Sequence, residues 1–136
     1  FGTLNNYDIP IKLNNVTVGK MTTNGRFGWG TTTPVSTMEV AGSVGFGNVV
    51  STNINYNADE DDYMIIVDAS GGMVVVTIPD AVNLYRREYV IKKIDSSSND
   101  VVISSASLID SSNNYTIDTQ WVSIKIKSDD VQWYVF

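Results

Sequence analysis

Apolar and polar residues are arranged differently in the two halves of the chain. Residues 1–50 hold short runs in which apolar and polar residues alternate, with glycine and asparagine between the runs. Residues 63–136 hold longer apolar runs bounded by polar turns. Alternation with period two is typical of a half-buried strand, and a short continuous apolar run of a strand buried on both faces. Because neither half shows a 3.6-residue period, the pattern predicts an all-β protein.

The N-terminal half is predicted to begin with a hairpin. Its strands are residues 9–13 and 16–21, and Asn14-Asn15 forms the turn, because asparagine tolerates positive φ. Asn24-Gly25 supplies the next turn. In the following run, Phe27-Gly28-Trp29-Gly30, both aromatic side chains lie on one strand face and bare backbone on the other. We expect this glycine face to meet neighbouring chains, and the alternative is a bulged strand in an ordinary sheet. Further strands are expected over residues 36–41 and 44–50.

In the C-terminal half, short strands recur at close spacing. They are expected over residues 63–67, 73–78, 87–94, 101–104, 115–117, 121–127 and 131–136, with a helical turn or loop at 81–86. Alternation places Val122, Ile124 and Ile126 inward, and Trp133 is expected in the core or a subunit interface. This arrangement predicts a β-sandwich or β-prism domain.

These patterns predict a β segment over residues 1–52, an acidic linker over 53–62 and a C-terminal β-domain over 63–136. The first segment has too few large apolar residues to fold alone, so we expect it to oligomerise. The candidates for the interface between chains are Phe27, Trp29, Val40 and Phe46. Because the chain starts at Phe1 without methionine, we expect it to be part of a longer protein.

Composition narrows the possible functions. Of the 136 residues, 43% are hydrophobic, 18% are charged, and the net charge is −6. An acidic chain is not expected to bind nucleic acid or an anionic membrane surface, and no apolar run is long enough for a membrane helix. The chain has no cysteine and no histidine. It therefore has no disulfide, no thiolate or imidazole metal ligand, and no Ser-His-Asp triad.

Carboxylates are the remaining side chains that could bind a metal ion or act in acid–base catalysis. Asp59 and Asp61 lie in the dense acidic run 59–62 and are the candidate calcium ligands, because calcium binds clustered oxygen atoms. A solvated linker is the alternative, since the run lacks the spacing of a calcium loop. Most other acidic residues stand at turns, and no acid–base pair stands out. We expect no enzymatic activity, no catalytic residue and no cofactor.

Exposed aromatic residues could bind a ligand. Trp121, Tyr115 and Tyr85 are the candidates for stacking on a sugar, because such rings join an apolar face to a polar edge. The alternative is that these rings belong to the core or to a subunit interface.

Residues 14–44 resemble a unit of tailed-bacteriophage tail-fibre and related virion proteins. The matching steps, in order, are Asn24-Gly25, Gly28-Trp29-Gly30-Thr31, Thr33-Pro34, Met38-Glu39-Val40 and Gly42-Ser43. Trp29 departs from the usual Ile or Val and implies a wider packing site. Residues 61–136 are similar to a domain of phage structural proteins, through Asp62-Tyr63, Pro79-Asp80-Ala81, Tyr89 to Lys93, Ile109-Asp110, Ser128-Asp129 and Trp133-Tyr134. Ser111 and Asp130 stand where glycine is usual.

The resemblance implies a homotrimeric, β-rich fibre component displayed outside the cell on a virion. The N-terminal segment would be an intertwined shaft and the C-terminal domain a knob or spacer. Expected partners are copies of the chain, other tail proteins and a host-surface glycan or protein. Two alternatives remain open at this point: a carbohydrate-binding adhesin domain of a bacterial surface protein, and a non-catalytic part of a glycan-degrading tailspike.

Overall fold

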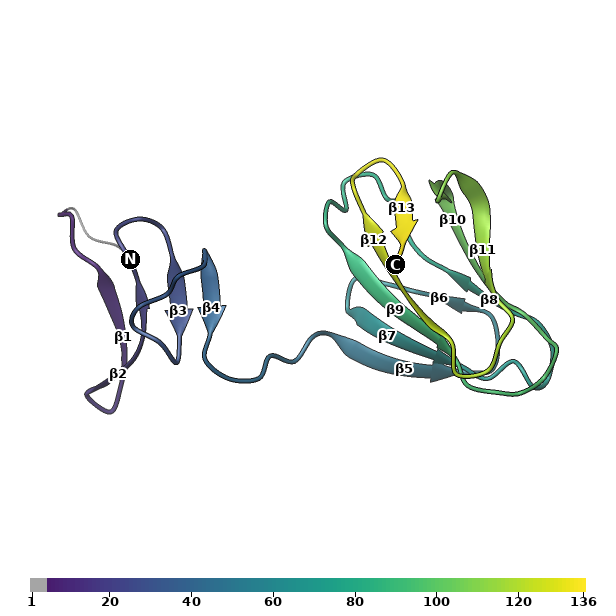
Figure 1. Cartoon of the computed structure of the whole chain (residues 1–136), viewed down its shortest axis with the longest axis horizontal. Helices are drawn as coiled ribbons and strands as arrows, with labels where there is room; N and C mark the ends of the chain where they lie inside the picture. The colour runs from purple at the N-terminus through teal and green to yellow at the C-terminus, as the bar shows by residue number, and fades with distance from the viewer. Residues whose placement is uncertain (1–4) are drawn as a thin grey trace. The chain divides into compact units, whose positions relative to one another are not determined.

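A computed structural model describes residues 5–136 of the chain, and these residues form only strands and turns (Figure 1). The predicted all-β class is confirmed. The chain divides into two compact units, the first ending at Gly45 and the second running from Phe46 to Phe136. No helix that could cross a membrane occurs in the described residues.

The first unit is a four-stranded sheet with the order β1-β2-β3-β4. Its strands are β1 (Ile9–Leu13), β2 (Val16–Met21), β3 (Phe27–Trp29) and β4 (Met38–Val40). β1, β2 and β3 pair antiparallel, whereas β4 pairs parallel to β3. The parallel pairing requires a crossover, which residues 30–37 supply.

The turns of the first unit are formed by the residues that the sequence predicted. Asn14 and Asn15 both have positive φ, 47° and 62°, and they close the β1–β2 hairpin as expected. Gly25, with φ of 80°, turns the chain between β2 and β3. Ser111 and Asp130 also adopt positive φ, 65° and 81°. They therefore take the left-handed conformation that glycine would adopt most easily.

The glycine face of β3 lies against the chain's own backbone, so the expectation that it meets neighbouring chains is wrong. A Cβ atom on Gly28 would lie 2.6 Å from the carbonyl oxygen of Thr31 and 3.3 Å from Cδ of Pro34. Pro34 is buried. The crossover from β3 to β4 thus occupies the space that the missing side chain leaves.

The second unit is a nine-stranded sheet with the order β5-β7-β9-β12-β13-β10-β8-β6, in which β11 pairs with β10. The strands are β5 (Asn48–Thr52), β6 (Tyr56–Asn57), β7 (Asp62–Val67), β8 (Val74–Thr77), β9 (Glu88–Lys93), β10 (Val101–Ile109), β11 (Ser112–Ile117), β12 (Ser123–Ser128) and β13 (Trp133–Val135). Where a sandwich or prism was expected, hydrogen bonds join all nine strands into one nearly barrel-shaped sheet. Residues 81–86 form turns.

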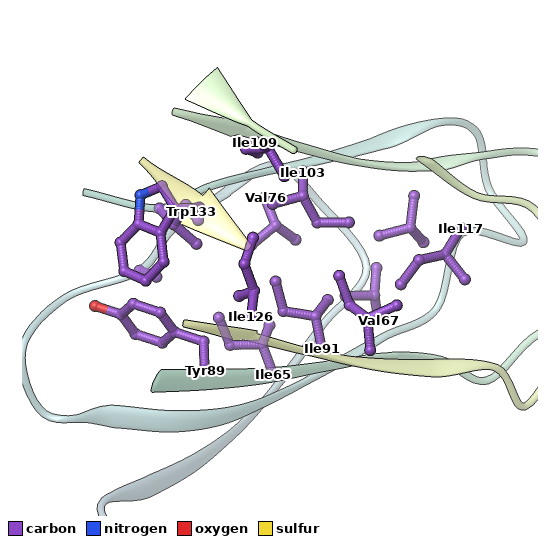
Figure 2. Close-up of a cluster of buried hydrophobic side chains, with 14 of the residues drawn as sticks. Ile65, Val67, Val76, Tyr89, Ile91, Ile103, Ile109, Ile117, Ile126 and Trp133 are labelled. Atoms are coloured by element: carbon purple, nitrogen blue, oxygen red, sulfur yellow. The ribbon is translucent and has the colours of Figure 1, made fainter. Parts of the chain in front are cut away.

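The core lies inside this curved sheet (Figure 2). Alternate residues of its strands point inward, such as Ile65 and Val67 of β7, both fully buried. Trp133 is also fully buried, and its ring lies 5.7 Å from that of Tyr89. The indole Nε1 donates to the carbonyl oxygen of Pro79 at 3.0 Å, so the one polar atom of the ring is satisfied.

The sequence predicted that the first unit ends at residue 52 and the linker at residue 62. The structure instead divides the units between Gly45 and Phe46. Residues 48–52 form β5, which pairs in parallel with β7 and so belongs to the second unit. Within the expected linker, β6 pairs with β8, and Asp62 is buried at the start of β7. A polar stretch can still supply backbone hydrogen bonds to a sheet, and side-chain composition does not reveal this.

Candidate functional site

One face of the first sheet consists of apolar side chains. Strand register places one row of residues across the four strands at Ile9, Met21, Phe27 and Met38, and a second row at Ile11, Gly19, Trp29 and Val40. Paired residues, and residues two apart on one strand, share a face. We refer to this surface as the apolar sheet face; its side chains are Ile9, Ile11, Met21, Phe27, Trp29, Met38 and Val40.

The opposite face of the same sheet is polar and partly covered. It carries Lys20, Gly28 and Glu39, which lie in one row across β2, β3 and β4. The Glu39 carboxylate accepts a hydrogen bond from the backbone N–H of Val35 at 2.7 Å, and Arg26 donates to the carbonyl oxygen of Pro34 at 3.1 Å. These contacts hold the crossover over the polar face and leave the apolar sheet face uncovered.

The apolar sheet face is partly exposed in the single chain: Ile9, Ile11, Phe27 and Val40 are half-buried, and the other three side chains are exposed. Met38 is 65% exposed, Trp29 45% and Met21 39%, and no large apolar side chain is buried among residues 5–45. A sheet normally buries one face, because apolar burial is the main favourable term in folding. The first unit therefore presents the kind of surface that another sheet covers.

Three of the four residues expected at an interface between chains lie together on this face: Phe27, Trp29 and Val40. The fourth, Phe46, belongs to the second unit, where its ring lies 5.3 Å from that of Tyr63. The sequence had not indicated Met21 and Met38 as their companions. Parallel pairing of β4 beside β3 aligns Met38 with Phe27, and nothing in the spacing of these residues reveals that pairing.

The acidic run 59–62 forms a loop held by Arg87 and Tyr89. Arg87 Nη2 donates to the carbonyl oxygens of Asp59 and Asp62, at 3.1 and 2.6 Å, and the Tyr89 hydroxyl also donates to that of Asp59, at 2.9 Å. The two calcium candidates, Asp59 and Asp61, are exposed, and Asp59 Oδ1 accepts from the backbone N–H of Asp61. Within residues 5–136, no three acidic side chains converge as a metal site would require.

Asp62 is the buried member of the run and has a structural role. Its Oδ2 accepts hydrogen bonds from the Tyr56 hydroxyl at 2.9 Å and from the backbone N–H of Asp59 at 3.0 Å. The hydrogen bond to Asp62, followed by partial burial, raises the pKa of Tyr56 to about 12. This arrangement fixes the loop between β6 and β7.

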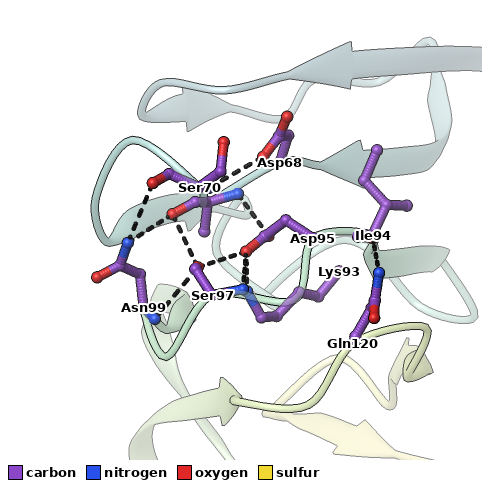
Figure 3. A network of polar contacts seen from close by, with 9 residues as sticks. Asp68, Ser70, Lys93, Ile94, Asp95, Ser97, Asn99 and Gln120 are labelled. Atoms are coloured by element: carbon purple, nitrogen blue, oxygen red, sulfur yellow. Dashed lines mark hydrogen bonds and ion pairs between the residues drawn. The ribbon is translucent and has the colours of Figure 1, made fainter.

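A buried ion pair closes one end of the core (Figure 3). Lys93 Nζ lies 2.7 Å from Oδ1 of Asp95, and both side chains are almost fully buried. Asp95 also accepts from the backbone N–H of Ala69 and from Ser97. Although burial opposes ionisation, the hydrogen bonds from Lys93, Ser97 and the Ala69 backbone hold the pKa of Asp95 well below its usual range. Lys93 follows Tyr89 and Ile91 with period two, so alternation could have located it.

The three aromatic candidates lie on separate elements. Tyr115 on β11 is half-buried and packs against the core. Tyr85 stands in the turns before β9, 63% exposed, with the Arg86 guanidinium 4.9 Å from its ring centroid. Trp121 precedes β12 and is 61% exposed. Lys92 Nζ lies 5.8 Å from the centroid of its indole ring.

No family model, curated protein or solved structure matches the chain.

Proposed function

We propose that the chain is a structural component of a bacteriophage tail fibre or virion appendage that contributes to host-surface attachment. In this proposal the first unit joins copies of itself into a trimeric shaft, and the second unit serves as a folded knob or spacer. The role is mechanical and needs neither a catalytic residue nor a cofactor. The site of action is the virion, outside the cell, with other tail proteins as neighbours.

The observation that carries the proposal is the uncovered apolar sheet face. Trp29 and Met38 remain exposed in the single chain although they belong to a continuous apolar surface. Sheets of only four strands, each three to six residues long, have little surface to bury within themselves. Packing against another sheet would bury the apolar side chains that the first unit cannot bury by itself.

Copies of the same chain are the partner that the first unit favours. An apolar sheet face is complementary to another apolar sheet face, and closed symmetry lets every copy bury the same surface. Three sheets arranged as a prism would each turn this face toward a common axis. The order of the Asn24-Gly25, Gly28-Trp29-Gly30-Thr31 and Thr33-Pro34 steps, which resembles a fibre unit, supports the same arrangement.

Two methionines of similar exposure provide a matched test. Met38 lies on the apolar sheet face and is 65% exposed, whereas Met73 lies in the second unit and is 60% exposed. Met38→Ala should shift the association equilibrium toward single chains in light scattering over a dilution series, at a cost of about 2 kcal/mol per copy, typical of a residue at the centre of an interface. Met73→Ala should leave the association unchanged. Equal behaviour of the two variants would contradict the proposal.

A further inference from the structure

Trp121 is a large aromatic residue with a backbone conformation that is unfavourable for bulky side chains. Its φ is 65°, in the left-handed region that a bulky residue rarely occupies. Such a conformation is strained for a bulky side chain, whereas glycine adopts it without this strain. The ring is nevertheless 61% exposed, so core packing does not explain why an indole stands here. Strain of this kind in an exposed aromatic residue suggests a binding role.

Trp121 is held in place by several neighbours. Its backbone N–H donates to the carbonyl oxygen of Lys93 at 2.9 Å, and its own carbonyl oxygen accepts from Lys92 Nζ at 3.1 Å. The same Nζ lies 5.8 Å from the centroid of the indole ring. Beside it, the Gln120 amide donates to the carbonyl oxygen of Ile94 at 3.0 Å, as Figure 3 shows. The backbone of Trp121 is therefore fixed by hydrogen bonds, and Lys92 lies over its indole ring.

A surface hollow of about 290 Å³ lies on the neighbouring strands. Its lining combines apolar and polar side chains from the ends of β5, β7 and β9: Ser51, Thr52, Asn53, Ile66, Asp68 and Ile94. The Asp68 carboxylate is fixed by the backbone N–H of Ser70, which donates to Oδ1 at 2.9 Å. The lining of the hollow thus includes two isoleucines and a positioned carboxylate.

Lys92 connects Trp121 to the strands of the hollow, because its Nζ lies 5.8 Å from the centroid of the indole ring and donates to the Trp121 carbonyl oxygen. Ser51, Ile66, Lys92 and Ser123 form one row across β5, β7, β9 and β12. They point away from the core, since Lys93, next to Lys92, points inward. Four adjacent strands span about 14 Å at the usual spacing of about 4.8 Å. This length suits a short chain of linked rings better than a single small molecule.

We propose that this surface binds a neutral oligosaccharide, an inference that rests on the proposed attachment function for its biological purpose. Trp121 stacks on the apolar face of one pyranose ring, and Asp68, Asn53 and Lys92 bond the hydroxyl groups of the rings beside it. Lys92 and Asp68 carry opposite charges and balance each other, and the chain as a whole has a net charge of −6. A neutral glycan therefore fits better than an anionic one.

Nuclear magnetic resonance of the full chain tests the site directly. The three tryptophans give three indole N–H signals, and Trp133 is an internal reference because it is fully buried. We expect maltotriose, cellotriose or chitotriose to shift the Trp121 signal at millimolar concentration and to leave the Trp133 signal in place. No shift with any of the three, or a shift with trigalacturonate alone, would overturn the proposal.

Variants at Trp121 separate binding from folding. Trp121→Gly suits the positive φ, so the protein should remain folded while affinity falls at least tenfold, and Trp121→Tyr should keep part of it. Val131→Ala, at a side chain that is 72% exposed, is the control and should bind as the wild type does. Unchanged affinity of Trp121→Gly would contradict the site. Light scattering on the same samples separates the two proposals: a trimer that binds no glycan rejects only this site, and a monomer that binds rejects only the shaft.

Discussion

The two units form sheets with an apolar face, but only the second can cover its own. Nine strands are enough to curve the second sheet around a core, in which Ile65 and Val67 are fully buried. Four short strands cannot curve in this way, and Met38 on the first sheet stays 65% exposed. Strand number decides whether a sheet can cover its apolar face within one chain.

The largest effect on the second unit is expected from Asp95→Ala. This substitution leaves the Lys93 ammonium buried without its partner, and an uncompensated buried charge costs about 3–5 kcal/mol. Urea unfolding of residues 46–136 measures the loss. Lys125→Met is the control, because its ion pair with Glu88 is half-exposed and contributes at most about 1 kcal/mol. Similar losses for both variants would show that the buried pair has no special role.

A smaller effect, confined to the first unit, is expected from Gly28→Ala. The added Cβ would lie 2.6 Å from the carbonyl oxygen of Thr31, so the crossover must shift, at a cost of about 1–3 kcal/mol. Gly71→Ala is the matched control, since nothing lies within 4 Å of a Cβ atom at that position. Hydrogen exchange should show faster exchange in β1–β4 for Gly28→Ala and unchanged exchange in β5–β13. Equal protection of the first sheet in both variants would argue against the close packing of the crossover.

The sequence predicted what depends on local chemistry. Asn14-Asn15 closes a hairpin, because asparagine tolerates the positive φ that the turn demands. Trp133 is buried as its alternation indicated. Val122, by contrast, is 41% exposed although it continues the inward series of Ile124 and Ile126. It precedes the first residue of β12, and a period extended beyond a strand end carries no information about faces.

What the sequence could not predict depends on partners distant in the chain. β5 lies at residues 48–52 and pairs with β7, and the acidic loop is fixed by Arg87 and Tyr89, some thirty positions further on. The apolar sheet face likewise depends on the parallel pairing of β3 and β4. Many registers satisfy the same alternation, so composition does not select among them.

The smallest expected effect is the contribution of Asp95 to the pH dependence of the second unit. The pKa of Asp95 is lowered in the folded state, so its stabilisation is present above the unfolded value of about 3.9 and is lost as pH falls below it. Between pH 6 and pH 3 this amounts to about 1 kcal/mol. Urea titrations of residues 46–136 should therefore show a steeper acid loss for the wild type than for Asp95→Ala. An equal loss of unfolding free energy with falling pH in both proteins would contradict the lowered pKa of Asp95.

The central claim is that the first unit is completed by copies of itself, whereas the second unit is complete alone. Light scattering of the full chain and of residues 46–136, at equal concentration, tests both halves of the claim. We predict the mass of three chains for the full protein and of one chain for the fragment. A full chain that remains a single molecule, with β1–β4 protected from hydrogen exchange, would contradict the account.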